Sequence, residues 1–493
     1  MRRILDLPFL VILMGIAALV MYIPAAYALN LRDHAEARAF FYSGTLFLVT
    51  TAMIGVATAN YQPRNAGHSH LVALAAAYLL LPLMLAVPFS EAVSDTRFFN
   101  AWFEMVSSFT TTGATLYDSP GRLPPSVHLW RGLVGWLGGF FTLLAALAIL
   151  APLNLGGFEV SETVHAPRPD RLTRFAVTLA PVYGGLTALL WIGLLIAGET
   201  GLVGVMHAMA VMATSGISPV GGIGGGQSGP VGEIMMFCFL MFALSRHALP
   251  GGTMGTARYL RDDPELRMGL SLVALATAAL FLRHWAGALA EPVETNGSGV
   301  VMILRALWGS AFTVMSFLTT TGFVSDAWEG ARLWSGIGAP GLLLVGLAMI
   351  GGGIATTAGG VKLMRVFALY KHGMREMEKL VHPSSIGGAG SAARRLRRQG
   401  AFAAWVFFML YALSIAVVML ALGLSGIGFE AGLIYTISAL STTGQLAYVA
   451  TETPLSYVGL SGAAQVVLAA AMIVGRLETL AIIALLAPDM WRK

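Results

Sequence analysis

Phe109-Thr110-Thr111-Thr112-Gly113-Ala114-Thr115 places three threonines before a glycine, and this pattern returns three times in degenerate form. The later copies are Met212-Ala213-Thr214-Ser215-Gly216-Ile217-Ser218, Leu318-Thr319-Thr320-Thr321-Gly322-Phe323-Val324 and Leu440-Ser441-Thr442-Thr443-Gly444-Gln445-Leu446. Their glycines are 103, 106 and 122 positions apart, so the period is about one hundred residues. We call these stretches the hydroxyl-glycine loops, and their recurrence predicts four units of one kind.

Long apolar runs flank each loop. The 493 residues are 56% hydrophobic and 11% charged, whereas a typical soluble domain has about 25% charged residues. A membrane-spanning helix needs about 20 apolar residues. Ten runs fit, at 8–29, 39–59, 69–90, 128–151, 174–198, 231–248, 269–290, 335–370, 401–424 and 457–487. Cys238 is the only cysteine, so an intrachain disulfide is excluded. Its side chain is expected to pack inertly in an apolar helix.

Lysine and arginine collect in alternate loops, which places those loops in the cytosol. The basic positions are Arg2 and Arg3, Arg168, Arg171 and Arg174, Arg246, Arg258 and Arg261, the segment from Lys371 to Arg398, and Arg492 with Lys493. Loops 199–229 and 425–456 contain neither residue and are expected outside. Both termini are therefore expected in the cytosol. The net charge of +5 could suggest a nucleic-acid partner, but the collection of Lys and Arg in alternate loops is explained by membrane topology, so no nucleic-acid partner is expected.

Each unit is interpreted as an outer helix, a short re-entrant helix, a hydroxyl-glycine loop and an inner helix. Parallel repeats of this kind are related by an axis along the membrane normal. We therefore predict an all-α integral membrane protein, with four parallel repeats around a pseudo-four-fold pore axis and an N-terminal two-helix hairpin. The predicted divisions are 1–65 for the hairpin, 66–155, 156–255 and 256–395 for the first three pore repeats, and 396–493 for the fourth.

The hydroxyl-glycine loops are the candidate ion site. Non-helical backbone at membrane depth is tolerated where it lines a cavity, and rings of backbone carbonyls replace the hydration shell of a cation without fixed charge. Glycine permits the positive φ that aims successive carbonyls inward. The re-entrant helices Asn100–Thr110 and Ala431–Ala439 would add their negative C-terminal ends. The candidate ligands are Thr111, Thr112, Gly113, Thr214, Ser215, Gly216, Thr320, Thr321, Gly322, Thr442, Thr443 and Gly444.

From about residue 66 to its end the chain resembles the Trk/Ktr/HKT superfamily of potassium transporters, and it is most similar to the TrkH branch. The supporting motifs are Phe103-Glu104 before the first loop, Trp136-Leu137-Gly138-Gly139, Thr357-Ala358-Gly359-Gly360-Val361-Lys362 and Gly475-Arg476-Leu477-Glu478. The resemblance implies one filter strand per unit. Because glycine stands at all four filter positions, it also implies potassium selectivity, with rubidium as a congener.

Two departures from the family pattern point to looser selectivity. Ser215-Gly216-Ile217 lacks the middle threonine of the other strands, and Gln445 follows the last glycine where a small or apolar residue is usual.

The resemblance further implies a homodimer in a bacterial inner membrane, surrounded by lipid. A cytosolic ring of TrkA-like, nucleotide-binding regulatory subunits is the implied partner, and no covalent cofactor is expected.

The run 335–370 is too long for one spanning helix. It would extend about 54 Å at 1.5 Å per residue, against about 30 Å of hydrocarbon, so it should be broken. We place the break at Gly351-Gly352-Gly353-Ile354-Ala355-Thr356-Thr357-Ala358-Gly359-Gly360, the glycine-rich loop. The resemblance suggests that this loop obstructs flow until a partner moves it; the alternative is close helix packing through small residues.

Arg476 lies deep in the last apolar run, where an ionisable side chain usually faces a cavity or a partner. We hypothesise that it projects into the path below the filter, contacts the glycine-rich loop and forms an electrostatic barrier. The alternative is a buried ion pair that locks two helices. Lys362 is expected either at the pore or snorkelling to water, and Glu104 is a candidate to bond filter backbone or to recruit cations.

Two other functions remain open. A secondary carrier could couple potassium to protons or sodium in symport, although such carriers place ionisable residues at the midplane. An intramembrane hydrolase could use His207 or His247 with Ser425 or Ser461, but these residues are not expected to converge. We therefore favour channel-like conduction, and we expect no enzyme.

Overall fold

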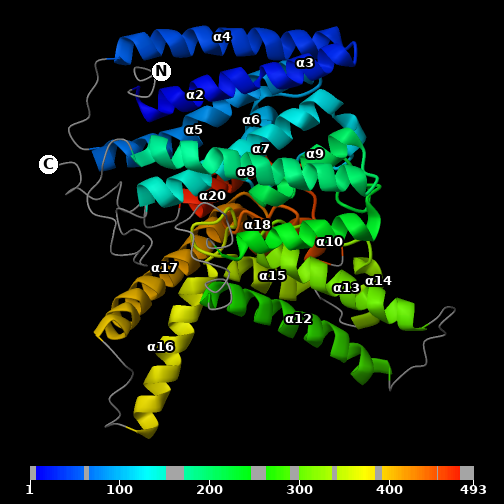
Figure 1. The fold of residues 1–493 in the computed structure, drawn as a ribbon, viewed down its shortest axis with the longest axis vertical. Helices are drawn as coiled ribbons and strands as arrows, with labels where there is room; N and C mark the ends of the chain where they lie inside the picture. Colours follow the sequence, from blue (N-terminus) through cyan, green and yellow to red (C-terminus); the bar gives the residue numbers. More distant parts are fainter. Residues whose placement is uncertain are drawn as a thin grey trace.

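The computed structural model describes residues 7–59, 66–150, 171–245, 263–288, 299–335, 341–382, 391–451 and 453–477. Within these ranges the chain is helical and contains no strand (Figure 1). The first helices are α2 (Phe9–Val20), α3 (Tyr22–Asn30), α4 (His34–Thr58), α5 (Ala66–Ala92), α6 (Phe98–Phe109), α7 (Pro125–Ala145), α8 (Arg171–Ile196), α9 (Gly201–Ala213) and α10 (Gly229–Leu240). They are followed by α12 (Pro264–Ala288), α13 (Gly299–Leu318), α14 (Trp328–Ser335), α15 (Gly341–Ile350), α16 (Leu363–Val381), α17 (Ser391–Leu424), α18 (Phe429–Leu440), α19 (Leu446–Val449) and α20 (Gly462–Leu477).

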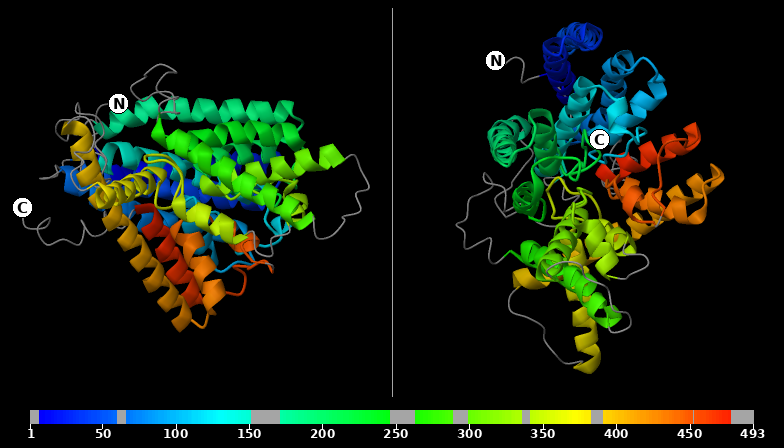
Figure 2. Two further views of the ribbon diagram at one scale, coloured as in Figure 1. Left: turned by 90° about the horizontal axis from the view of Figure 1, so that it is seen from below. Right: turned by 90° about the vertical axis from the view of Figure 1, so that its right-hand side faces the viewer.

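Eight helical stretches in the described ranges are long and apolar enough to cross a membrane, as a multi-pass protein requires. The first three belong to an N-terminal hairpin and the helix beside it. Helices α2 and α3 pack along α4, whose first turn is capped by the Asp33 carboxylate through the backbone N–H groups of Ala35 and Glu36, both at 3.2 Å. This hairpin packs on α5 and lies at the edge of the molecule (Figures 1 and 2).

The remaining helices form four groups that follow one another around a centre, as the right panel of Figure 2 shows. The groups are α5, α6 and α7; α8, α9 and α10; α12, α13 and α15; and α17, α18 and α20. In each group the middle helix is re-entrant and ends at a hydroxyl-glycine loop. The third helix packs against the re-entrant helix of the next group, through α7 on α9, α10 on α13 and α15 on α18. Helix α20 packs on α6, which closes the circle.

The break predicted within 335–370 is confirmed. Helix α15 ends at Ile350, and α16 begins only at Leu363. The chain between them takes positive φ at Gly351 (74°) and Gly360 (75°), which glycine adopts without strain. The backbone N–H of Gly353 donates to the carbonyl of Ala243 at 2.9 Å, so the loop is anchored to the end of the α10 segment.

Other boundaries differ from the prediction. A full span was expected at 231–248, but α10 stops at Leu240 and a single 3-10 turn follows. The third re-entrant helix, α13, has 20 residues and is longer than expected. Helix α13 is long and apolar enough to cross a membrane, so hydrophobicity and length did not distinguish this re-entrant helix from a spanning one. Cys238 is exposed on α10, so the prediction of inert packing was wrong.

Candidate cation-binding site

The four re-entrant helices end in the same way. After α6, the N–H of Thr111 donates to the Ser108 carbonyl at 2.9 Å and that of Thr112 to Ser107 at 2.8 Å. This pair of bonds is a Schellman motif, which satisfies the last carbonyls of a helix. The equivalent pairs are Thr214 to Val211 with Ser215 to Ala210, Thr320 to Phe317 with Thr321 to Ser316, and Thr442 to Ala439 with Thr443 to Ser438.

A threonine occupies the left-handed position of every cap. The φ angles are 55° at Thr111, 51° at Thr214, 57° at Thr320 and 54° at Thr442. Glycine is the usual residue there, and a left-handed β-branched residue is an outlier that costs about 1–3 kcal/mol. The caps persist because these threonines are fully enclosed by the surrounding structure. Each cap turns the chain out of its helix into a non-helical strand.

The four hydroxyl-glycine loops meet in cyclic order. The Cα of Gly113 lies so close to the Ser215 carbonyl oxygen that a Cβ would overlap it, and Gly216 lies in the same way against Thr321. Gly322 lies beside the side chain of Thr443. The Gly444 N–H donates to the Thr112 carbonyl at 2.6 Å and completes the circuit. The twelve predicted ligand residues are all buried and are brought together at this ring.

Hydroxyl groups hold parts of the ring from behind. Ser107 Oγ donates to the Ala114 carbonyl at 2.7 Å in the first loop. In the fourth loop Ser438 Oγ donates to the Thr443 carbonyl at 2.9 Å, and the hydroxyl of Tyr457 donates to Gly444 at 3.0 Å. These bonds orient the strands without adding charge.

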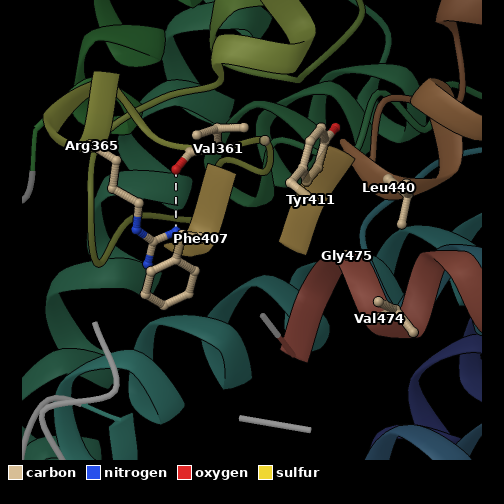
Figure 3. A pocket seen from close by; sticks show the side chains of 8 residues that line it. Val361, Arg365, Phe407, Tyr411, Leu440, Val474 and Gly475 are labelled. Atoms are coloured by element: carbon tan, nitrogen blue, oxygen red, sulfur yellow. Dashed lines mark hydrogen bonds between the residues drawn. The ribbon is translucent and has the colours of Figure 1, made fainter. Parts of the chain in front are cut away.

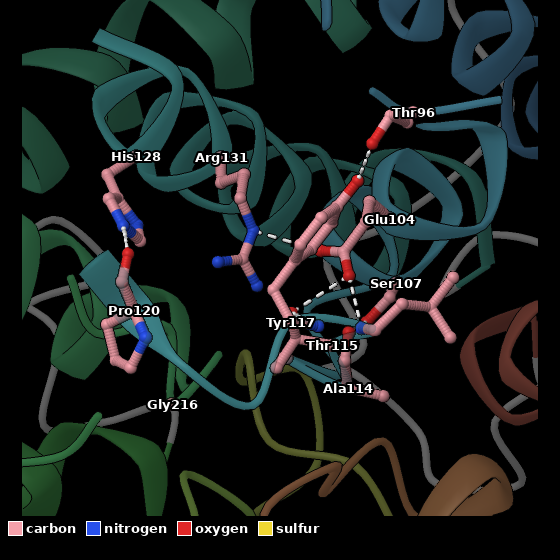
Figure 4. Close-up of polar contacts among 12 residues, drawn as sticks. Thr96, Glu104, Ser107, Ala114, Thr115, Tyr117, Pro120, His128, Arg131 and Gly216 are labelled. Carbon is pink, nitrogen blue, oxygen red and sulfur yellow. Dashed lines mark hydrogen bonds and ion pairs between the residues drawn. The ribbon is translucent and has the colours of Figure 1, made fainter. Parts of the chain in front are cut away.

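Glu104 braces the strand that follows the first loop (Figure 4). Its Oε1 accepts from the Leu116 N–H at 2.5 Å and from the Thr115 hydroxyl at 2.9 Å. Its Oε2 forms an ion pair with Arg131 Nε at 3.0 Å, and both side chains are buried. Glu104 therefore accepts a hydrogen bond from the backbone, as considered from the sequence, but at Leu116, one residue after the first hydroxyl-glycine loop. Sequence reasoning missed Arg131, although an arginine within an apolar run is a recognisable signal.

A second acidic brace, Glu233 on α10, joins neighbouring groups and was also missed. Its carboxylate accepts from the Ser325 hydroxyl at 2.8 Å and from the Asp326 N–H at 2.8 Å, directly after the third loop. Trp308 Nε1 on α13 donates to the same carboxylate at 2.7 Å. The strand after the third loop is thus held by a helix of the preceding group.

The glycine-rich loop lies directly under the ring. The N–H of Gly359 donates to the hydroxyl of Thr320 at 2.7 Å. The Cα of Gly359 also approaches the Ser441 carbonyl so closely that a Cβ would overlap it. The loop is therefore attached to the base of the third and fourth strands. Thr356 stabilises its turn by donating from Oγ1 to the Gly353 carbonyl at 2.7 Å.

Arg476 lies on α20, buried, and its Nη2 donates to the hydroxyl of Thr111. Arg476, Gly359 and Lys362 line one cavity below the ring, as do Thr356 and Tyr78. The hypothesis placed Arg476 against the glycine-rich loop, and the two share this cavity, while the hydrogen bond of Arg476 goes to Thr111 in the first hydroxyl-glycine loop. Lys362 is 7% exposed and its Nζ donates to the Ala358 carbonyl, so it faces the cavity and does not snorkel. Glu478 lies outside the described residues.

A neighbouring cavity separates the lower end of the glycine-rich loop from α17 and α20 (Figure 3). Arg365, in the first turn of α16, donates from Nη1 to the Val361 carbonyl at 3.2 Å. Its guanidinium lies 3.6 Å from the centroid of the Phe407 ring on α17. Helix α16 is thereby connected both to the end of the loop and to the outer helix of the fourth group.

Comparison with known proteins agrees with this architecture. Residues 252–493 match the family model described as TrkH, cation transport protein. The chain is 30% identical over 429 residues to the Trk system potassium uptake protein TrkH of Halomonas elongata, covering 84% of this chain and 82% of that protein. It is 28% identical over 487 residues to the protein of the same name from Escherichia coli K12, with 96% of each covered. The crystal structure of the potassium transporter TrkH from Vibrio parahaemolyticus matches with a TM-score of 0.82 and 25% identity, over 100% of this chain and 99% of that one.

Proposed function

Because this chain belongs to the TrkH family of cation transport proteins, we propose that it is the potassium-translocating membrane subunit of a Trk-type uptake system. The names of its relatives support potassium as the transported ion, with rubidium as a congener. Membership of a transport family sets aside the intramembrane hydrolase. His207 pairs instead with Ser218 at 3.0 Å, and His247 lies outside the described residues.

The observation that carries the proposal is the meeting of the four hydroxyl-glycine loops in cyclic order, with main-chain carbonyls of Thr112, Ser215 and Thr321 at the contacts between loops. An ion that enters must exchange water for other oxygens, and a ring of neutral carbonyls supplies them without a charge that would trap it. Four helix C-termini are directed at this ring and contribute partial negative charge. The ligands in this proposal are the twelve residues from Thr111 to Gly444 named above.

Gating in this proposal depends on the glycine-rich loop. Gly351, Gly352, Gly353, Thr356, Thr357, Gly359 and Gly360 form the movable obstruction, and Lys362 and Arg476 form the electrostatic barrier. The hydrogen bond from Gly359 to Thr320 supports a closed arrangement, since it attaches the obstruction to the filter. Movement of α16 would pull on the loop through Arg365 and Val361.

The assembly in this proposal is a homodimer in a bacterial inner membrane, with both termini cytosolic. The name of the relatives, a Trk system, supports partner subunits, and we propose a TrkA-like, nucleotide-binding cytosolic ring that acts through α16. The hairpin 1–65 is proposed as accessory. Residues 66–155, 156–255, 256–395 and 396–493 are proposed as the four pore repeats.

Channel-like conduction is favoured over coupled symport by the hydrogen bonds of Glu104 and Glu233, two buried acids next to the ring. A proton- or sodium-coupled carrier needs an ionisable group that faces the path. Glu104 and Glu233 are each used by backbone and side-chain donors behind the strands. Both are therefore assigned to bracing rather than coupling.

The test is current through the purified chain reconstituted in lipid vesicles. We expect potassium current to reverse at the potassium equilibrium potential and to keep that reversal when pH or sodium is changed. A reversal potential that follows the proton or sodium gradient would favour the carrier. Absence of potassium and rubidium flux, in protein that is folded and inserted, would overturn the proposed function.

A further inference from the structure

Gln445 is the residue through which the fourth loop touches the filter glycines of all three other loops. Its Nε2 lies 3.3 Å from the Gly113 carbonyl oxygen and 3.2 Å from that of Gly216. Its Cβ and Cγ lie against Gly322, and its Cγ also against Gly216. The side chain therefore extends from α19 across the ends of the other strands.

The chemistry of the contacts identifies which end of the amide points inward. A backbone carbonyl oxygen only accepts hydrogen bonds, so the atom between Gly113 and Gly216 must be the NH₂ group of Gln445. The positive end of an N–H dipole thus occupies a position that two carbonyl oxygens would otherwise offer to a cation. The carbonyl oxygens of Gly113 and Gly216 cannot accept hydrogen bonds from the amide and fully coordinate an entering ion at the same time.

We propose that the Gln445 amide is a tethered competitor for the outermost cation position of the filter, and that it sets the apparent affinity for the transported ion. This deepens the proposed function and rests on it. A monovalent cation enters this position only after the amide has swung aside. Because only the fraction of molecules with the amide displaced accepts the ion, the apparent dissociation constant is raised by the inverse of that fraction. The side chain is only partly buried, so solvent is available to receive the displaced amide.

The test uses two variants of the full chain in lipid vesicles. Gln445→Met keeps the side-chain length but removes the donor, and Gln445→Ala removes both. We expect the half-saturating potassium concentration for flux to fall about fivefold or more in both variants, from the loss of two competing hydrogen bonds, while maximal flux is maintained or raised. Gln227→Ala, at an exposed glutamine of the outer loops, is the matched control and should leave both quantities unchanged.

If Gln445 only supports the structure of the loops, the two variants should behave differently. In that case maximal flux or ion selectivity falls and half-saturation does not, which would overturn the proposal. Potassium-dependent thermal stabilisation of the purified protein measures affinity independently, and its midpoint should shift by the same factor. A competitor is dispensable for folding, so failure of both variants to fold also counts against it. Absence of flux in the unmodified chain refutes the proposed function itself, whereas normal flux there with unshifted variants refutes only this inference.

Discussion

Arg476 on the last described helix donates a hydrogen bond to the hydroxyl of Thr111, 365 positions earlier in the chain. The bond places a guanidinium against the first hydroxyl-glycine loop. Arg476 shares its cavity with Lys362, so two basic side chains face the space below the ring of hydroxyl-glycine loops, which the proposed function assigns to the ion path. A cation passing this space meets like charge in a poorly hydrated environment, where charge interactions are stronger than in water.

The first prediction concerns this barrier. Arg476→Ala should raise basal potassium flux, measured without regulatory partners, by roughly tenfold, which corresponds to about 1.4 kcal/mol of barrier. Arg476→Lys should stay close to the unmodified chain because it keeps the charge. Arg122→Ala, on the exposed outer surface, is the control. Unchanged or lower flux in folded Arg476→Ala protein would instead indicate a structural role.

The second prediction concerns the acidic brace behind the first loop. Arg131→Met leaves the Glu104 carboxylate buried and without its ion-pair partner, which should destabilise the fold by about 3–5 kcal/mol and lower the melting temperature in detergent. The pair of Arg122 with Asp95 is the matched comparison, because its side chains are 50% and 59% exposed. Arg122→Met should leave the melting temperature unchanged. Equal effects of the two substitutions would contradict the bracing role.

The third prediction tests the contact between the glycine-rich loop and the filter. A Cβ at Gly359 would overlap the Ser441 carbonyl, so Gly359→Ala should push the loop away from the ring and raise basal flux severalfold. Gly373→Ala, on α16, is the control, because a Cβ at that position meets no atom within 4 Å. A lower flux in folded Gly359→Ala protein would show that the loop does not obstruct the path.

The fourth prediction concerns selectivity. Gly216 has φ of +61° and lies against the Thr321 carbonyl, so Gly216→Ser must displace the second or third strand. The permeability ratio of potassium to sodium, obtained from bi-ionic reversal potentials, should approach unity. Gly184→Ser, at an open position of α8, should keep the original ratio. Retention of full selectivity by folded Gly216→Ser protein would remove Gly216 from the ligand set.

The fifth prediction concerns pH at the outer surface. Burial opposes ionisation of Glu199, in the loop before α9, but N–H groups of Gln227, Thr200 and Ser228 outweigh it and lower the pKa of this carboxyl below 4.5. A lowered folded-state pKa contributes stability above the ordinary pKa, and that contribution is lost as pH falls through the folded value. The protection of the Gln227 amide against hydrogen exchange, relative to its intrinsic exchange rate at each pH, should therefore fall below about pH 4.5. In the Glu199→Gln variant the Gln227 amide should exchange faster already at neutral pH, and its protection should no longer change near pH 4.5.

Much of the architecture could be predicted from local sequence. Apolar runs of spanning length predict most of the helices, and the four-fold return of a hydroxyl residue before glycine predicts the four loops that meet. The break after Ile350 could be predicted because a mainly apolar run of 36 residues would be longer than the membrane is thick and five of the residues at the break are glycines.

The remainder depends on which segments meet in space. Nothing local to Glu104 indicates that Arg131 would be its partner, and nothing local to Gln445 indicates that its amide reaches two other loops. The left-handed threonines also could not be expected from residue preference, because glycine is the preferred residue at that position. Tertiary packing imposes those angles, so they appear only in the complete fold.

The bond from Gly444 to Thr112 also bears on how such a protein is made. The chain leaves the ribosome from its N-terminus, and the first loop enters the bilayer long before the last hairpin exists. Since the fourth loop closes the ring, nascent chains of three units have an incomplete filter. We therefore expect a stalled or truncated product to be unable to dissipate the ion gradients of the cell, and to be recognised by quality-control proteases through its unfilled central surface.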